Sequence, residues 1–134
     1  MNPITVEWVA KAESDFRNAS WHLTSGGPPA HDLICFLAQQ CAEKYLKACL
    51  QEADVRFPKV HDLPPLLDLM PQVPAALTQL RPQLRKLSEL AIDVRYPGYF
   101  ADDAKARQAM ETAAEVRRIC RMELGLGPDP QSQP

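Results

Sequence analysis

The segment from Ala30 to Leu50 constrains the fold more than any other part of the sequence. Its apolar residues recur every three or four positions, which places them on one face of an α-helix. These residues are Ile34, Leu37, Ala38, Cys41, Tyr45, Ala48 and Cys49. A second face of this helix carries three polar residues, Gln40, Glu43 and Lys47. Large apolar residues, Phe36 and Leu50, lie at the two ends of that face. The pattern predicts a central helix with neighbours on two sides.

The segments that flank this stretch also follow helical spacing. A helix is predicted from Ile4 to about Ser25, and the Gly-Gly-Pro-Pro sequence after it suits an antiparallel return into the central helix. Downstream, a proline-interrupted loop leads to Asp62, a suitable N-cap for a short helix from Pro64 to Met70. Helical stripes separated by helix breakers favour short connections between antiparallel helices.

Two further helices are predicted in the C-terminal half. The apolar stripe from Leu77 to Val94 predicts a fourth helix, in which Pro82 marks either a kink or the start of the regular part. A fifth helix is expected to begin after Asp102 or Asp103 as its N-cap. Its inner stripe is Ala106, Ala109 or Met110, Ala113, Val116 and Cys120. The small alanines there allow close helix packing.

No segment of the sequence shows the period-two alternation of a β-strand, and we find no internal repeat. The predicted fold class is therefore all-α: an antiparallel up-and-down bundle of four long helices plus one short helix. We expect the bundle to occupy residues 1–124. The remainder, residues 125–134, is expected to be a flexible tail.

Composition narrows the class of protein. The 134 residues fit one domain, and a net charge of −2 gives no general basic field for nucleic acid. Contact with nucleotide or RNA must therefore come from a local patch.

The amino terminus lacks the basic and apolar regions of a signal peptide, so we expect a cytoplasmic protein with no membrane segment. Cys35, Cys41, Cys49 and Cys120 have no CxxC spacing and are expected to be reduced core residues.

The polar face of the central helix is the first candidate site. It carries Gln39, Gln40, Glu43, Lys44 and Lys47, and Glu43 with Lys47 has the spacing of a helical ion pair. One interpretation is a solvated or interhelical hydrogen-bonding face. The other is a polar groove that binds phosphate or a base, because lysines offer charge and glutamine amides can read base edges.

The second candidate is the sequence Arg-Tyr-Pro-Gly-Tyr-Phe at residues 95–100, which ends the predicted fourth helix. Tyr96 and Tyr99, beside the guanidinium of Arg95, suit a platform on which bases stack. The same aromatic residues suit a plug at the end of the bundle or a dimer contact.

The third candidate is His61 with its neighbour Asp62. A histidine held by a carboxylate can act as a general base, although adjacent residues need not face one another. Helix capping explains the same pair. His22 and His31 are isolated and no metal-ligand spacing occurs, so we expect no metal and no cofactor.

Three motifs, AQQCAEKYLKACL, FPKVHDL and VRYPGYFADDAKARQAMETAAEVRRIC, occur in this order. Together they resemble the HEPN domain, named for its presence in higher eukaryotes and prokaryotes and for presumed nucleotide binding. The resemblance runs from Trp8 to about Met122. It implies an up-and-down bundle that commonly forms a homodimer and is often encoded beside a minimal nucleotidyltransferase, in pairs similar to toxin-antitoxin modules.

Many HEPN proteins are also ribonucleases, in which an arginine and a histidine a few residues later form the site near the dimer cleft. The resemblance places Arg95 at the arginine position, yet no histidine follows His61 in the sequence. The nuclease pair is therefore incomplete, and the chain resembles the branch with an Arg-Tyr-Pro signature.

Three functional hypotheses are compatible with these observations. In the first, the chain is a non-catalytic, nucleotide-associated partner of a separate minimal nucleotidyltransferase. Its candidate ligand contacts are Gln40, Glu43, Lys44, Lys47, Arg95, Tyr96 and Tyr99. In the second, the chain is a metal-independent ribonuclease that uses Arg95 with an unconventional base such as His61. In the third, it is a dimerisation or assembly module.

Overall fold

The computed structural model describes residues 1–25 and 28–128, and all regular structure in this part of the chain is helical. The helices are α1 (Pro3–Thr24), α2 (His31–Glu52), α3 (Leu63–Asp68), α4 (Ala75–Gln79), α5 (Arg81–Asp93) and α6 (Asp103–Glu123). The predicted all-α class is confirmed. None of these helices has the length and apolar character needed to cross a membrane.

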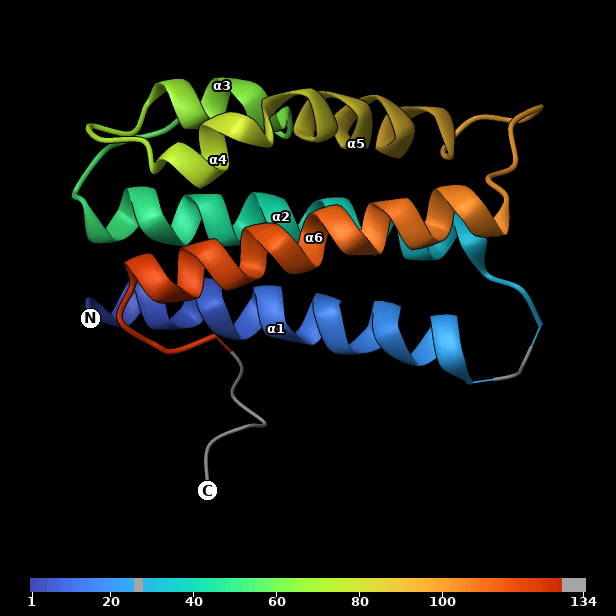
Figure 1. Ribbon diagram of the computed structural model, residues 1–134, viewed down its shortest axis with the longest axis horizontal. Helices are drawn as coiled ribbons and strands as arrows, with labels where there is room; N and C mark the ends of the chain where they lie inside the picture. The colour runs from blue at the N-terminus through green and yellow to red at the C-terminus, as the bar shows by residue number, and fades with distance from the viewer. Residues whose placement is uncertain (26–27, 129–134) are drawn as a thin grey trace.

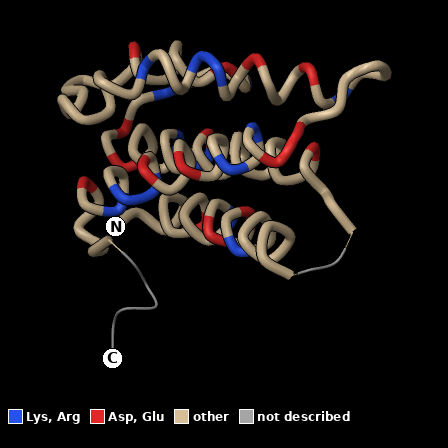
Figure 2. The backbone as a smooth tube through the Cα atoms, turned by 45° about the vertical axis from the view of Figure 1, so that its right-hand side comes forward, with Lys and Arg blue, Asp and Glu red and all other residues tan. Residues whose placement is uncertain are grey.

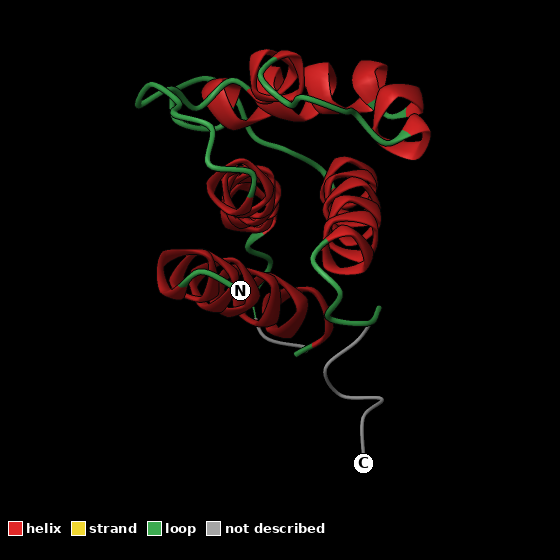
Figure 3. Ribbon diagram, turned by 90° about the vertical axis from the view of Figure 1, so that its left-hand side faces the viewer, coloured by secondary structure: helices red, strands yellow, loops and turns green. Residues whose placement is uncertain are grey.

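The helices run up and down in three layers. α1 and α2 are antiparallel neighbours, the chain returns through α3, α4 and α5, and α6 runs back beside α2 (Figure 1). Seen along the helices, α1 forms one outer layer, α2 and α6 the middle, and α3 to α5 the other outer layer (Figure 3). α2 contacts α1, α3, α5 and α6, which confirms its central place.

The ends of the long helices follow from local chemistry. α1 begins at Pro3, and the Asn2 side-chain oxygen accepts a hydrogen bond from the Ile4 amide at 2.8 Å. α6 is capped by Asp102, which accepts from the Lys105 amide at 2.8 Å. Between α5 and α6 the chain turns at Gly98, whose φ of +92° is a conformation that favours glycine. Because the Asp102 side chain makes the capping hydrogen bond, Asp102 and not Asp103 is the N-cap of α6.

The segment predicted as one fourth helix is two helices. α4 ends at Gln79 and α5 begins at Arg81, so Pro82 lies in the first turn of α5, where its missing N–H removes no hydrogen bond. The alternative in which the regular helix starts near Pro82 is confirmed. A continuous helix from Leu77 is not formed, and the bundle has a second short helix in addition to the one predicted.

The apolar stripe of α2 forms the centre of the core. Ile34, Ala38, Cys41, Tyr45 and Ala48 are buried, whereas Leu37 and Cys49 are half-buried. All four cysteines are free thiols. Burial raises the pKa of Cys35 to about 11 and raises that of Cys41 further, so both thiols stay protonated at neutral pH.

A charged cluster lies between α1, α2 and α6. Glu13 accepts from Arg117 Nε at 2.7 Å and from Nη2 at 3.0 Å, and the Tyr45 hydroxyl donates to the same carboxylate. Arg121 Nη1 lies 3.4 Å from the Tyr45 hydroxyl. Burial opposes the charge of Glu13, but these hydrogen bonds outweigh it and hold its pKa below the ordinary value.

The chain after α6 turns back over this cluster. Arg121 is buried and donates to the carbonyl oxygen of Gly127 at 2.8 Å and to that of Leu126 at 3.3 Å. These contacts involve the first residues of the segment predicted as a flexible tail. Residues 129–134 of that segment lie outside the described residues.

Replacing Glu13 tests how much the charged cluster contributes to the free energy of unfolding. Glu13→Gln removes the carboxylate that pairs with the partly buried Arg117 and accepts from Tyr45, so we expect the free energy of unfolding to fall by about 3 kcal/mol at neutral pH. Glu115→Gln is the matched control, because Glu115 pairs with Arg118 at the surface and should cost less than about 1 kcal/mol. Urea-induced unfolding measures both values.

The same variant has a defined pH dependence. The pKa of Glu13 is lower in the folded than in the unfolded chain. Its contribution is therefore complete above the unfolded value of about 4.3 and is lost as the pH falls through the folded value. The stability difference between wild type and Glu13→Gln should shrink below about pH 4. A difference that stays constant on acidification would contradict this account.

Candidate functional site

A cleft of about 310 Å³ lies between α2, α5 and the loop that precedes α3. α5 contributes most of the lining, through residues spaced three or four apart on one face. The lining residues are Gln39, His61, Asp62, Arg85, Ser88, Glu89, Ala91, Ile92 and Arg95. His61 and Arg95, which belong to separate motifs in the sequence, therefore share one cleft.

Glu43 is the centre of a buried hydrogen-bond network behind this cleft. Its side chain accepts from Lys47 Nζ at 2.9 Å, from Gln39 Nε2 at 3.1 Å and from Gln40 Nε2 at 3.5 Å. His61 Nδ1 lies 3.0 Å from Oε1 and 3.2 Å from Oε2 of the same carboxylate. Only 3% of Glu43 and 5% of Lys47 is exposed. The charge of each is thus stabilised by the other and by neighbouring polar groups.

The surroundings of Lys47 explain how a lysine is buried here. Its ammonium lies 5.7 Å from the ring centroid of Trp8 in α1 and 5.8 Å from that of Phe57 in the loop after α2. Both rings offer the negative face that attracts a cation. The ion pair with Glu43 has the predicted spacing, but it is enclosed by protein instead of solvated. This part of the α2 polar face is therefore an internal hydrogen-bonding surface.

The loop before α3 forms one wall of the cleft, and Gln39 and Ser88 hold this loop in place. Gln39 Nε2 donates to the backbone carbonyl oxygen of His61 at 2.7 Å, and Gln40 Nε2 donates to Gln39 Oε1 at 2.8 Å. At the start of α3, the Leu63 amide donates to Ser88 Oγ on α5 at 2.9 Å. The loop is thus tied to α2 on one side and to α5 on the other.

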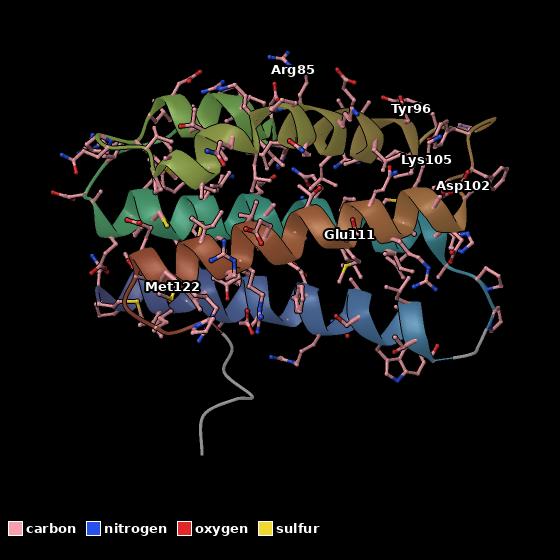
Figure 4. The ribbon with its side chains drawn as sticks, viewed as in Figure 1. Arg85, Tyr96, Asp102, Lys105, Glu111 and Met122 are labelled. Atoms are coloured by element: carbon pink, nitrogen blue, oxygen red, sulfur yellow. The ribbon has the colours of Figure 1, made fainter. Side chains whose placement is uncertain are left out.

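Arg85 and Arg95 supply two guanidinium groups to the cleft. Both residues are exposed. The Arg95 guanidinium lies 5.2 Å from the ring centroid of Phe36 on α2, a cation–π geometry that positions its side chain. Figure 4 shows Arg85 on the outer side of α5 and Tyr96 at the end where the chain leaves α5. As lining residues, Arg85 and Arg95 offer the cleft guanidinium donors of the kind that suits a phosphate or carboxylate.

The other predicted ligand contacts lie elsewhere. Lys44 pairs with Asp15 of α1 at 2.6 Å, so its charge is directed between those helices. Tyr99 is half-buried with Lys105 Nζ 5.9 Å from its ring, and Tyr96 is 64% exposed. Among the predicted contacts, only Arg95 lines the cleft; Gln40, Glu43 and Lys47 belong to the network behind it.

None of the α5 residues that line the cleft is among the site residues predicted from the sequence. Arg85, Ser88 and Glu89 follow helical spacing with Ile92 and Arg95. A run of charged residues on the outer face of a predicted helix was the available signal. That signal is not specific by itself, because residues of both signs are spread along the other helices as well (Figure 2).

Two further clefts among those in the described part of the chain can be compared with this one. One of about 500 Å³ lies at the ends of α2 and α6, with Glu52 and Glu123 as its charged lining residues. Its charge does not suit an anion. The other, of about 250 Å³, places Lys86 and Lys105 between α5 and α6 and has no histidine. No group of three metal-binding side chains occurs among the described residues.

Comparison with known proteins gives the family of this chain. No curated protein matches it. Its structure is similar to the crystal structure of ST0689, an archaeal HEPN homologue, with 25% sequence identity and a TM-score of 0.68. That match covers 90% of this chain and 97% of the archaeal one. The family model of the HEPN domain matches residues 5–123. The chain therefore belongs to the HEPN domain family.

Proposed function

We propose that the cleft between α2 and α5 binds the phosphate group of a nucleotide or of an RNA strand. The observation that supports this function is the presence of Arg85, Arg95 and His61 around one cleft. Guanidinium groups donate two parallel hydrogen bonds to phosphate oxygens. Asp62 and Glu89, which line the same cleft, can accept hydrogen bonds from sugar hydroxyl or base amino groups. The mixed lining suits a nucleotide better than a simple anion.

Exposed aromatic side chains in the segment after α5 offer surfaces for a base. Tyr96 follows Arg95 directly and is 64% exposed, and Phe100 is 86% exposed. Base stacking on such rings contributes about 1–3 kcal/mol per base in proteins that bind single strands.

Membership of the HEPN family supports a partner of a specific kind. Under this proposal the chain is a nucleotide-associated, non-catalytic partner of a separate minimal nucleotidyltransferase, in a toxin-antitoxin-like module. The cleft would hold the nucleotide, and the partner would supply the transfer chemistry. A minimal nucleotidyltransferase encoded beside this chain would favour the proposal.

Titration with ATP, GTP and a short single-stranded RNA tests the binding function. Arg95→Ala removes one charged donor from the cleft, so we expect the dissociation constant to rise about 10-fold or more. Arg107→Ala is the control, since Arg107 pairs with Asp103 on the surface of α6 and should leave the affinity unchanged. Isothermal titration calorimetry on folded protein measures both. If no probe binds, with or without a co-expressed nucleotidyltransferase, the proposal is wrong.

A metal-independent ribonuclease is the second candidate, supported by the shared cleft of Arg95 and His61. His61 would take the proton of a ribose 2′ hydroxyl as its oxygen attacks phosphorus, the bond to the 5′ oxygen breaks, and water returns a proton to that oxygen. The prediction is cleavage of labelled RNA in EDTA that falls about 100-fold or more in both Arg95→Ala and His61→Ala. RNA left intact by folded wild-type protein would exclude this activity and favour the non-catalytic function.

As the alternative to base stacking on these rings, we propose that the chain forms a homodimer through the exposed residues around the end of α5. Ile92, Tyr96 and Phe100 are 55%, 64% and 86% exposed, and aromatic residues are enriched in the cores of protein interfaces. Tyr96→Ser with Phe100→Ser should yield monomers by light scattering. Trp21→Ser on α1 is the control, because Trp21 is as exposed as Tyr96 but lies in a different layer. A wild-type monomer, or a dimer unaffected by the double variant, would contradict this interface.

A further inference from the structure

We infer that Glu43 fixes the proton of neutral His61 on Nδ1, which leaves Nε2 as a hydrogen-bond acceptor at the cleft. The two Nδ1 distances to the Glu43 carboxylate, 3.0 and 3.2 Å, are hydrogen-bond distances. His61 lines the cleft with its side chain 66% exposed. Its second ring nitrogen has no hydrogen-bond partner within residues 1–25 and 28–128, so it is the one left for a ligand.

The direction of this hydrogen bond follows from the other partners of Glu43. Lys47 Nζ lies 2.9 Å from Oε2, and an ammonium can only donate. Gln39 also donates to the carboxylate, through its Nε2 at 3.1 Å. A carboxylate surrounded by donors accepts from each of them and has no proton to give. His61 Nδ1 must therefore donate, and in the neutral imidazole Nε2 then carries the lone pair.

Gln39 holds His61 in the position from which its ring can donate to Glu43. The same side-chain nitrogen donates to the His61 carbonyl oxygen at 2.7 Å and to Glu43, so it joins the loop backbone to the carboxylate that orients the ring. An exposed side chain without such contacts samples several rotamers. Gln39, Glu43 and Lys47 are thus positioning residues for His61, and the charged pair on α2 has a role beyond stability.

The position of the proton on His61 determines which kind of ligand group its Nε2 can bind. An unprotonated Nε2 near Arg85 and Arg95 accepts a hydrogen bond from a hydroxyl on the ligand whose phosphate the arginines hold. A ribonucleotide carries such a hydroxyl next to its phosphate. This use of Nε2 rests on the function proposed above, whereas the position of the proton on His61 does not.

Nitrogen-15 NMR of the imidazole rings tests the inference directly. At about pH 8.5, where histidines are neutral, two-bond proton–nitrogen spectra show which ring nitrogen carries the proton. His61→Gln assigns the signal by its loss. We expect wild-type His61 to be mainly Nδ1–H. In Glu43→Leu/Lys47→Met the majority should shift to Nε2–H, the form that an unconstrained histidine side chain prefers. Both charges leave together in that variant, so no buried charge is unpaired.

Controls separate positioning from a general change of structure. Glu89→Gln alters a carboxylate of the same cleft that does not contact His61 in the described structure, and should leave the tautomer unchanged. His22 and His31 serve as internal references in every spectrum. Should the double variant unfold, Glu43→Gln keeps the side-chain volume and should give a mixture of tautomers.

Wild-type His61 found mainly as Nε2–H would overturn the inference, as would an unchanged Nδ1–H majority in the folded variants that lack the Glu43 carboxylate. These outcomes do not depend on any ligand. A protein that shows the expected tautomer but binds no nucleotide would overturn the proposed function alone.

Discussion

The buried carboxylate of Glu43 is the interaction on which the candidate site depends. A charged group at 3% exposure is stable only if its hydrogen bonds are satisfied. Here they come from its own helix, through Gln39 and Lys47, and from the loop after α2, through His61. Satisfying this one group therefore determines where the loop runs. The loop in turn leads into α3, whose first amide is bound by Ser88 of α5.

The opposite side of α2 is fixed by a second polar cluster. Tyr45 donates to Glu13 of α1, and Arg117 and Arg121 of α6 complete the group. α2 is thus held by charged networks toward α1 and α6 and toward the loop, with apolar side chains between them. Non-directional apolar packing alone would tolerate small rotations of α2. Hydrogen bonds to named partners on two sides specify its orientation, and with it the position of the cleft.

Much of the fold could be predicted because helix boundaries are set by nearby residues. Asp102 and the prolines act within one turn of their own position, so their effect is visible in the sequence. The break at Leu80 was the exception, since Leu77 continues the apolar spacing across it and Pro82 alone does not say where the preceding turn ends. Local rules thus predicted the class and the topology of the bundle, and missed the second short helix.

The candidate site was less predictable because its parts meet only in three dimensions. Spacing predicted the Glu43–Lys47 pair, but its burial depends on Trp8 and Phe57, which come from other elements. Lys44, which directly follows Glu43 in the sequence, is turned instead toward Asp15. Arg85 belongs to no sequence motif. It is a candidate ligand contact only because it lines the same cleft as Arg95 and His61.

Under the proposed function, the cleft between α2 and α5 binds a nucleotide. The most direct measurement is a titration of isotope-labelled protein with adenosine monophosphate, followed by amide chemical shifts. Binding in this cleft should give saturable shifts that cluster in residues 85–95, at the end of α5 and just after it, and around His61, with little change along α1. Shifts that cluster instead around Glu52 and Glu123, or no saturable shifts at all, would contradict it.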